Sequence, residues 1–473
     1  MGVADFLESK ISGSLNFEPT KGQVELFRSL AQFVTNREES DIMVVSGYAG
    51  TGKTSAIGAF VRTLKEFGYK YVLLAPTGRS AKVLSSFTGE PAFTIHKHIY
   101  RQKSLAGGLG QFTLNFNKAR DTFYIVDEAS LVTIDSAGSQ FGSGDLLEDL
   151  ISFMRGPSCS SGNALILIGD NAQLPPVGMN VSPALDEHYM SQYGTVEFSY
   201  LTEVVRQERE SGILHNATIL RSMITSMDES LPKFHLKGFD DIKRITGGDL
   251  IESLTDACDH YGSDDVVVLC RSNKRASIYN AGIRGQVLYR EERLNRGDKL
   301  MVVKNCYQFM EKLEDEDFFI ANGDVAELMK ISHYEERYGL NFAGARFRFP
   351  DYENLEITAR IILDTLTSDS PSLSQDQLKA LFEGVYADYY HIGDKRKRMA
   401  AVREDPFFNA MQIKYAAAIT CHKAQGGQWP CVFIDNPFWQ DEISAEDLKW
   451  LYTAMTRATD KIFLVNFKDS FFE

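Results

Sequence analysis

Short runs of apolar residues alternate with helix-compatible stretches over most of the chain. In the first half these runs are Ile42 to Val45, Lys70 to Ala75, Thr122 to Val126 and Ala164 to Ile168. Continuous apolar runs of this length are typical of parallel strands that helices cover on both faces. The alternation returns at Val266 to Cys270 and again after residue 412. The pattern therefore predicts an α/β protein with two domains of this kind.

Two segments interrupt the alternation. Between residues 96 and 121, two alternating runs flank the sequence AGGLG, which predicts a protruding β-hairpin. Residues 322–411 begin with period-two alternation, which predicts a small β-barrel insertion. They continue into a helix with the capping box Ser374 to Gln377 and then into the basic run Lys395 to Arg398. A solvated charge run is the simpler interpretation of these basic residues, and contact with DNA is the alternative.

Length and composition fit several ordinary globular domains. The 473 residues exceed the size of a single hydrophobic core, and 44% are hydrophobic. No apolar run approaches the roughly 20 residues of a membrane span, and no secretory signal opens the sequence, so we expect no membrane partner. The six cysteines lack CxxC spacing, which favours a reducing cytoplasm over a zinc or disulfide framework. The net charge of −14 disfavours nucleic acid as a partner, but a local basic channel is physically sufficient.

The sequence GYAGTGKT, between the first predicted strand and a predicted helix, matches the phosphate-binding pattern GxxxxGK[ST]. Its backbone amides can surround phosphates, Lys53 can reach the terminal phosphates, and the Thr54 hydroxyl can bind Mg²⁺. The predicted nucleotide-binding residues here are Gly47, Ala49, Gly50, Thr51, Gly52, Lys53 and Thr54. The sequence thus predicts a site for a nucleoside triphosphate with Mg²⁺.

Polar residues at the ends of other predicted strands extend this site. Asp127 can hold Mg²⁺ through water, and Glu128 can orient the attacking water. Gln173 can sense the γ-phosphate. Gln23, shortly before the phosphate loop, can bind an adenine edge, although a solvated helix residue is an equal alternative. These residues favour ATP hydrolysis.

Two arginines lie far from the phosphate loop in the sequence. Arg206 follows an apolar patch and can stabilise transition-state charge from a second domain, although a surface ion pair is the simpler interpretation of an isolated arginine. Arg457 is a second candidate for this role. In the loop after residue 75, Thr77, Arg79 and Lys82 can contact a phosphate backbone, and an ordinary helix start is the alternative.

The series GYAGTGKT, LLAPTGRSAK, IVDEAS, GDNAQLPPVG, LTEVVRQ, ITCHKAQGGQW and LYTAMTRA resembles the ordered motifs of superfamily 1 helicases, most of all the RecD-like branch. The resemblance implies two RecA-like P-loop domains, the first at 1–95 and 122–205 and the second at 206–321 and 412–473. It also implies a strand-separating hairpin at 96–121 and an SH3-like β-barrel insertion with a helical basic extension at 322–411.

The resemblance assigns roles residue by residue. Gln23 reads adenine, Lys53, Thr54, Asp127 and Glu128 perform the chemistry, Gln173 couples hydrolysis to DNA, and Arg206 and Arg457 reach the γ-phosphate. Gly427 joins the nucleotide site. The implied DNA-binding residues are Pro76, Thr77, Arg79, Lys82, Thr94, His96, Pro176, Val177, Thr420, His422 and Gln425.

By this resemblance the chain is a monomeric, ATP- and Mg²⁺-dependent helicase that moves 5′ to 3′ on single-stranded DNA and unwinds at junctions with duplex DNA. Such an enzyme would serve DNA replication, repair or recombination, with no protein partner identified. An RNA helicase or remodelling translocase of the same superfamily is the alternative. A P-loop switch that binds a protein without translocating is an alternative from another class.

Overall fold

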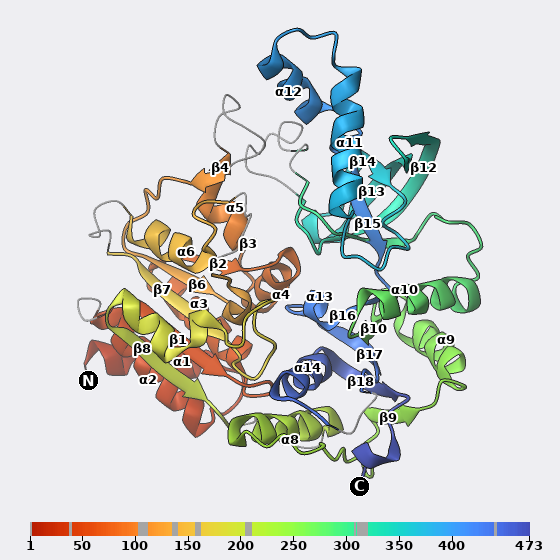
Figure 1. Ribbon diagram of the computed structural model, residues 1–473. Helices are drawn as coiled ribbons and strands as arrows, with labels where there is room; N and C mark the ends of the chain where they lie inside the picture. Colours follow the sequence, from red (N-terminus) through yellow and green to blue (C-terminus); the bar gives the residue numbers. More distant parts are fainter. Residues whose placement is uncertain are drawn as a thin grey trace.

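The computed structural model describes residues 2–36, 40–102, 112–134, 141–156, 162–203, 211–306, 309, 320–438 and 442–473. Two parallel sheets form two α/β domains, and a closed barrel stands beside them (Figure 1). The RecA-like two-domain fold with a barrel insertion that the sequence predicted is confirmed. Within the described residues, no helix combines the length and the apolar character that crossing a bilayer requires.

The first domain is built on a six-stranded parallel sheet in the order β3-β2-β6-β7-β1-β8. Its strands are β1 (Ile42–Gly47), β2 (Lys70–Ala75), β3 (Ala92–Thr94), β6 (Thr122–Val126), β7 (Ala164–Gly169) and β8 (Val196–Leu201). Alternate residues of the central strands face opposite layers of helices: Met43 and Val45 pack with one layer, and Ile42 and Val44 with the other. Burial on both faces explains the continuous apolar runs in the sequence.

Helices cover both faces of this sheet. One layer contains α1 (Val3–Gly13), α2 (Lys21–Thr35), α3 (Lys53–Glu66) and α4 (Gly78–Thr88). The other contains α5 (Ile95–Ile99), α6 (Leu146–Arg155) and α7 (Glu187–Met190). The two helices that begin directly after β1 and β2 are α3 and α4, so their N-termini lie at the carboxyl edge of the sheet, where α/β proteins bind ligands.

The second domain has a five-stranded sheet in the order β16-β10-β17-β18-β9. Its strands are β9 (Ile242–Ile245), β10 (Val266–Cys270), β16 (Ala418–Thr420), β17 (Trp429–Asp435) and β18 (Ala458–Val465). Helices α8 (Gly212–Ser226), α13 (Cys421–Ala424) and α14 (Ala445–Met455) cover one face, and α9 (Leu250–Tyr261) and α10 (Asn273–Gly282) cover the other. Ala172 and Leu174 of the first domain pack into the core under α14, so the two domains share an apolar contact.

The barrel closes through β11 (Lys299–Val302), β12 (Val325–Arg337), β13 (Leu340–Phe349), β14 (Leu355–Ile362) and β15 (Met411–Tyr415). Strand β11 pairs with both β12 and β15, which closes the ring. Since β11 and most of β15 lie outside residues 322–411, the barrel is larger than the segment that the sequence indicated. The strand at Leu300 therefore belongs to the barrel, although its apolar run reads like a strand of the second sheet.

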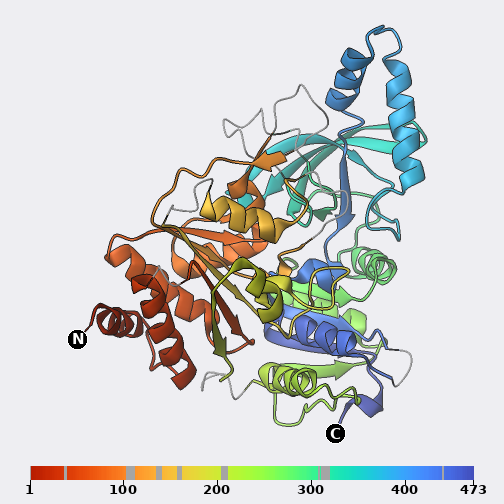
Figure 2. The same cartoon turned by 60° about the vertical axis from the view of Figure 1, so that its left-hand side comes forward.

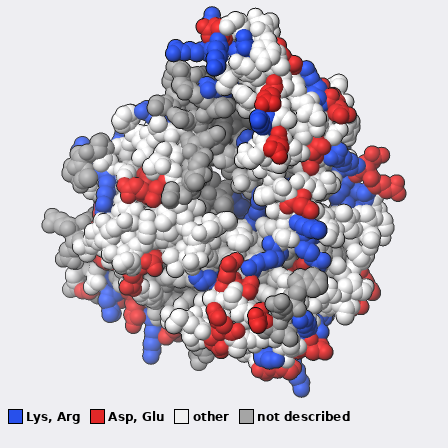
Figure 3. Space-filling view, in the orientation of Figure 1, with Lys and Arg blue, Asp and Glu red and all other residues white. Residues whose placement is uncertain are grey.

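Two helices, α11 (Gln375–Asp388) and α12 (Lys395–Glu404), project from the barrel (Figure 2). They pack through Leu381, Val385 and Val402 against Phe342 of β13. The basic residues Lys395 to Lys397 are exposed in the first turn of α12, and Figure 3 shows basic side chains at the corresponding end of the molecule. Whether these basic residues are only solvated or also contact DNA stays open.

The predicted hairpin is confirmed at its base, where β4 (Tyr100–Gln102) pairs antiparallel with β5 (Phe112–Leu114). Its tip lies outside the described residues. Residues 95–99 form the short helix α5 rather than a strand of the hairpin, and the Thr94 side chain caps this helix by accepting from the Lys97 backbone N–H.

Candidate functional site: a cleft between the two α/β domains

The phosphate loop lies between β1 and α3, as the sequence predicted. Gly50 and Gly52 have φ of 74° and 75°, in the left-handed region where a side chain is strained. Gly47 packs closely: a Cβ there would lie 2.9 Å from Leu201 Cβ and from Lys53 Cγ. The Lys53 ammonium donates to the carbonyls of Gly47 and Tyr48, the latter at 2.9 Å. The loop thus presents the N-terminus of α3 and a lysine, which together suit a phosphate group.

Three carboxylates gather beside this loop. Asp127 and Glu128 follow β6, and Asp127 Oδ1 accepts from the Glu128 backbone N–H at 2.9 Å. Burial, and then the Glu128 carboxylate, raise the pKa of Asp127 to about 6, while the Lys53 charge acts in the opposite direction. Asp170, which follows β7, is fully buried with its Oδ2 at 3.9 Å from Lys53 Nζ. Such a concentration of negative charge, partly withdrawn from water, is stabilised by cations.

The residues present fit the Mg²⁺ that the sequence implied. Thr54 is half-buried in the first turn of α3, and Asp127, also half-buried, follows β6 at the same edge of the sheet. Hydroxyl and carboxylate oxygens are the donors that Mg²⁺ prefers, usually together with water and phosphate. Their role as metal ligands stays a prediction.

The Gln23 side chain is engaged within the first domain. It is fully buried, its Oε1 accepts from the Thr20 backbone N–H at 3.0 Å, and its Nε2 donates to the Thr51 carbonyl at 3.2 Å. The amide therefore caps α2 and holds the phosphate loop. Binding of adenine by Gln23 stays a prediction, and it requires the side chain to exchange these contacts.

Arg457, directly after α14, reaches the cleft from the second domain. The side chain is 3% exposed, and its guanidinium donates to the carbonyls of Thr453 (3.1 Å) and Gly427 (3.2 Å). Its Nη1 lies 4.0 Å from Glu128 Oε1 of the first domain. A fixed guanidinium beside the candidate water-orienting carboxylate is the arrangement that an arginine finger needs. The other candidate finger, Arg206, lies outside the described residues.

Hydrogen bonds join the second domain to the loop after β7. Leu174 makes two of them. Its N–H donates to Thr453 Oγ1 at 2.8 Å, and its carbonyl accepts from Gln425 Nε2 at 2.6 Å. The neighbouring Gln173 is buried, and its Oε1 has no hydrogen-bond partner among the described residues. Gln173 therefore lies where a change in the cleft would reach the second domain.

The candidate DNA-binding residues after β2 contact other parts of the protein. Thr77 caps α4 by accepting from the Ser80 N–H at 3.1 Å. The Arg79 guanidinium stacks over the Trp429 ring at 3.9 Å, and Lys82 pairs with Asp351 of the barrel at 2.8 Å. Here the first domain touches both the second domain and the barrel. Pro76 precedes this capped turn.

The loop after β16 packs against the same turn. A Cβ at Gly426 would lie 3.2 Å from Thr77 Oγ1, and one at Gly427 would lie 3.0 Å from Arg79 Cδ. The structure thus brings together Thr77 and the Gln425 loop, two predicted DNA-binding positions from different domains. Thr420 and His422, at the start of this loop, are half-buried, and burial lowers the pKa of His422.

The remaining candidates are dispersed. His96 lies against Phe141, with ring centroids 4.7 Å apart, and burial lowers its pKa to about 4, so the ring is neutral at physiological pH. Pro176 is buried, but the adjacent Val177 is 79% exposed at the tip of the loop after β7. An exposed apolar side chain on a stiff Pro-Pro loop is available to a base.

Sequence reasoning missed two residues of the cleft, Asp170 and Tyr452. The Tyr452 hydroxyl donates to Asp170 Oδ2 at 2.7 Å and accepts from the Ala49 N–H at 2.8 Å. The sequence could have indicated Asp170, because this residue follows an apolar run just as Asp127 does. The sequence does not distinguish Tyr452 from a core residue, because it lies on an apolar helix.

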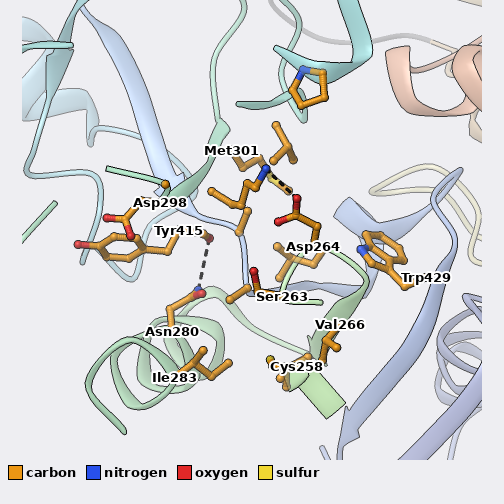
Figure 4. Close-up of a pocket in the computed structure, with 18 of the residues that line it drawn as sticks. Cys258, Ser263, Asp264, Val266, Asn280, Ile283, Asp298, Met301, Tyr415 and Trp429 are labelled. Carbon is orange, nitrogen blue, oxygen red and sulfur yellow. Dashed lines mark hydrogen bonds and ion pairs between the residues drawn. The ribbon is translucent and has the colours of Figure 1, made fainter. Parts of the chain in front are cut away.

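A separate cavity of about 430 Å³ lies where the first domain, the second domain and the barrel meet. Trp429 and Met301 line it, and Asp264 pairs with Lys299 at 2.9 Å inside it (Figure 4). Asn280 also lines it and donates to the Tyr415 carbonyl at 3.4 Å. None of the phosphate-loop residues lines this cavity.

Family models match the sequence on both sides of the cleft. A family model described as an AAA domain matches residues 19–226, and one described as a UvrD-like helicase C-terminal domain matches residues 415–465. The first contains the phosphate loop, and the second contains Arg457. Among solved structures, Bacteroides Pif1 helicase in complex with ADP-AlF3 and single-stranded DNA is 15% identical, with a TM-score of 0.47 over 97% of this chain and 95% of that one.

This chain matches three curated relatives over different shares of their lengths. The uncharacterized protein MJ1519 of Methanocaldococcus jannaschii is 23% identical over 91% of this chain and 37% of its own length. The ATP-dependent RecD2 DNA helicase of Deinococcus radiodurans is 28% identical over 34% of this chain and 19% of its own length. The ATP-dependent DNA helicase dda of Enterobacteria phage T4 is 23% identical over 94% of this chain and 99% of its own length. With a matching model on each side of the cleft and two helicase relatives, the chain is similar to the superfamily 1 helicases of the RecD-like branch.

Proposed function

We propose that the chain is an ATP- and Mg²⁺-dependent DNA helicase that moves 5′ to 3′ along single-stranded DNA. The observation that carries the proposal is the position of Arg457, whose guanidinium lies 4.0 Å from Glu128 although the two residues belong to different domains. A cleft whose catalytic groups come from two domains is completed only when those domains approach each other. Hydrolysis in such a cleft is therefore tied to domain movement.

The residues of the cleft divide the work of phosphoryl transfer. Lys53 and the amides of the phosphate loop bind the phosphates, and Glu128 orients the attacking water. Arg457 stabilises the charge that develops in the transition state, a contribution of about 10³ to 10⁵ in rate for arginine fingers. Thr54 and Asp127 would hold Mg²⁺, which supplies neutralisation of phosphate charge when it is bound.

Coupling to DNA follows from contacts that reach out of the cleft. Leu174, the neighbour of Gln173, hydrogen-bonds to Gln425 and Thr453 of the second domain. Thr77 lies against the turn after Gln425, so candidate DNA contacts of both domains change together when the cleft opens or closes. Alternate gripping of one strand by the two domains gives net movement.

Unwinding assays test substrate and polarity. Duplexes with a 5′ or a 3′ single-stranded tail are incubated with the protein, with and without ATP and Mg²⁺. We expect unwinding only from the 5′ tail and only with ATP. Unwinding restricted to the 3′ tail would refute the polarity. Stimulation of ATP hydrolysis by single-stranded RNA but not by DNA of the same sequence would favour the RNA helicase, and a protein switch would show no stimulation by either.

Lys53→Ala tests the nucleotide site. Without the ammonium, the terminal phosphates lose their main cationic contact in the loop, so we expect DNA-stimulated ATP hydrolysis to fall by at least about a hundredfold. Affinity for single-stranded DNA, measured by fluorescence anisotropy, should stay within about threefold, since Lys53 lies in the cleft. Lys65→Ala is the matched control on the same helix, because Lys65 is exposed and pairs with Glu90. Hydrolysis by Lys53→Ala at the rate of this control would show that the site is assigned wrongly.

A further inference from the structure

Tyr452 makes a pair of hydrogen bonds across the domain interface. It belongs to α14 of the second domain, yet its hydroxyl donates to Asp170 Oδ2 and accepts from the Ala49 N–H of the phosphate loop. Figure 1 shows α14 on the side of the second domain that faces the first. The Tyr452 side chain is 1% exposed, and burial raises its pKa well above the usual value. The hydroxyl is therefore neutral and serves as both donor and acceptor.

Asp170 lies between this hydroxyl and Lys53. Its Oδ1 accepts from the Ala172 N–H at 2.9 Å, and its Oδ2 accepts from Tyr452 at 2.7 Å. Lys53 Nζ is 3.9 Å from Oδ2, too far for a hydrogen bond, and donates to loop carbonyls instead. Both oxygens of this buried carboxylate thus have a donor without the lysine. A buried carboxylate that lost one donor would attract the nearest cation strongly.

The cation within ion-pair distance of Asp170 Oδ2 is Lys53, on which the proposed ATP hydrolysis depends. A direct Lys53–Asp170 hydrogen bond would hold the ammonium away from the terminal phosphates. The Tyr452 hydroxyl competes with the lysine for Oδ2, to which it already donates. Since Tyr452 is on one domain while Asp170 and Lys53 are on the other, this protection exists only when the domains are together.

We propose that Tyr452 is a positioning residue for ATP hydrolysis, which it supports by binding Asp170 across the closed cleft and so leaving Lys53 free for the nucleotide. The inference rests on the proposed function, because it assumes that Lys53 binds ATP. It gives domain closure a second effect on the cleft besides the placement of Arg457. Tyr452 itself touches neither the nucleotide nor the DNA in this scheme.

A double-mutant cycle tests the proposal. Tyr452→Phe, Asp170→Asn and the double variant are compared by kcat/KM for ATP with saturating single-stranded DNA. Affinity for a fluorescent, non-hydrolysable ATP analogue gives the same comparison without turnover. The matched control is Tyr279→Phe, which removes a buried Tyr–Asp hydrogen bond of 2.6 Å inside the second domain, away from the cleft. Thermal unfolding checks that each variant is folded.

We expect Tyr452→Phe to lower kcat/KM by about tenfold to a hundredfold, the effect of one hydrogen bond to a buried charge, and Tyr279→Phe to lower it less than twofold. In the Asp170→Asn background the same Tyr452→Phe change should cost less than threefold in kcat/KM and in analogue affinity, because a neutral amide does not capture Lys53. An equal cost in both backgrounds, or a loss below threefold in the native background, would overturn the proposal.

Two further results separate this inference from the proposed function. Absence of DNA-stimulated hydrolysis in the unsubstituted protein would refute the proposed function itself, whatever the variants do. If Tyr452→Phe does not fold, hydrogen exchange at the Ala49 amide of the unsubstituted protein carries the test. Single-stranded DNA alone should slow that exchange by bringing the domains together, and unchanged exchange would refute the role of Tyr452.

Discussion

Replacement of Asp324 by Asn should stabilise the protein at alkaline pH. Asp324, just before β12, is 5% exposed, and its Oδ2 accepts from the Tyr352 hydroxyl at 2.6 Å and from the Ala321 N–H at 2.7 Å. Burial is the main cause that raises the pKa of this carboxyl to about 7, against the lowering effect of both hydrogen bonds. An asparagine oxygen can accept the same two hydrogen bonds, and it carries no charge.

The sign follows from proton linkage. In the unfolded chain the pKa of an Asp is about 3.8, so between that pH and 7 the folded state binds more protons than the unfolded state. The contribution of Asp324 to the free energy of unfolding is therefore full below about pH 4 and is lost as pH rises to 7. The rise of the Asp324 pKa to about 7 corresponds to at most about 4 kcal/mol. The Asn variant does not ionise, so it keeps this stability at pH 8.

Urea unfolding of both proteins at pH 5 and pH 8 measures the effect. We expect Asp324→Asn to be more stable than the unsubstituted protein at pH 8, by up to about 4 kcal/mol, and the difference to narrow at pH 5. Asp376→Asn, at an exposed position in the first turn of α11, controls for the loss of one carboxylate. A variant that is less stable than the unsubstituted protein at pH 8, or an unchanged dependence on pH, would refute the reasoning.

Further substitutions test the cleft and the contact between the domains. Arg457→Ala should lower kcat of DNA-stimulated ATP hydrolysis by about 10³-fold while affinity for single-stranded DNA changes little. The control is Arg244→Ala, which removes an exposed ion pair on β9. Equal rates of hydrolysis by the two variants would contradict the assignment of Arg457 as an arginine finger. Gly427→Ala should destabilise the protein by about 1–3 kcal/mol in urea unfolding, because the new Cβ would lie 2.7 Å from the Trp429 ring. Gly393→Ala meets nothing within 4 Å and should be neutral, so equal stability of the two glycine variants would show that the Gly427 site adapts.

The sequence predicted those features that depend on neighbouring residues. The phosphate loop is a local motif, so Lys53 and its glycines lie where the pattern placed them. The strands of the first sheet are buried on both faces and left continuous apolar runs that only a strand or a buried helix produces. The base of the hairpin at Tyr100 followed in the same way from alternation.

Features that depend on distant partners escaped prediction. Strand β11 has an apolar run like those of the α/β sheets, and only its pairing with β12 and β15 assigns it to the barrel. The hydrogen bonds of the Gln23 amide to the Thr20 and Thr51 backbone could not be predicted from its residue type, and its binding of adenine stays a prediction. Lys82 looked available to DNA, and its partner Asp351 is 269 residues away in the chain. Charge and hydrogen-bonding capacity can be read from residue type, but the partner that uses them cannot.

Electrostatics explains why the two domains need each other at this cleft. The first domain buries Asp170, places the half-buried Asp127 next to Glu128, and holds Lys53 Nζ 3.9 Å from Asp170 Oδ2. The second domain contributes the Arg457 guanidinium, 4.0 Å from Glu128, and the Tyr452 hydroxyl, which donates a hydrogen bond to Asp170. Separation of the domains would remove both and leave the carboxylates to compete for Lys53. In the mechanism that we propose, closure compensates charge and frees the lysine in one movement, which ties the chemistry of the loop to the relative position of the domains.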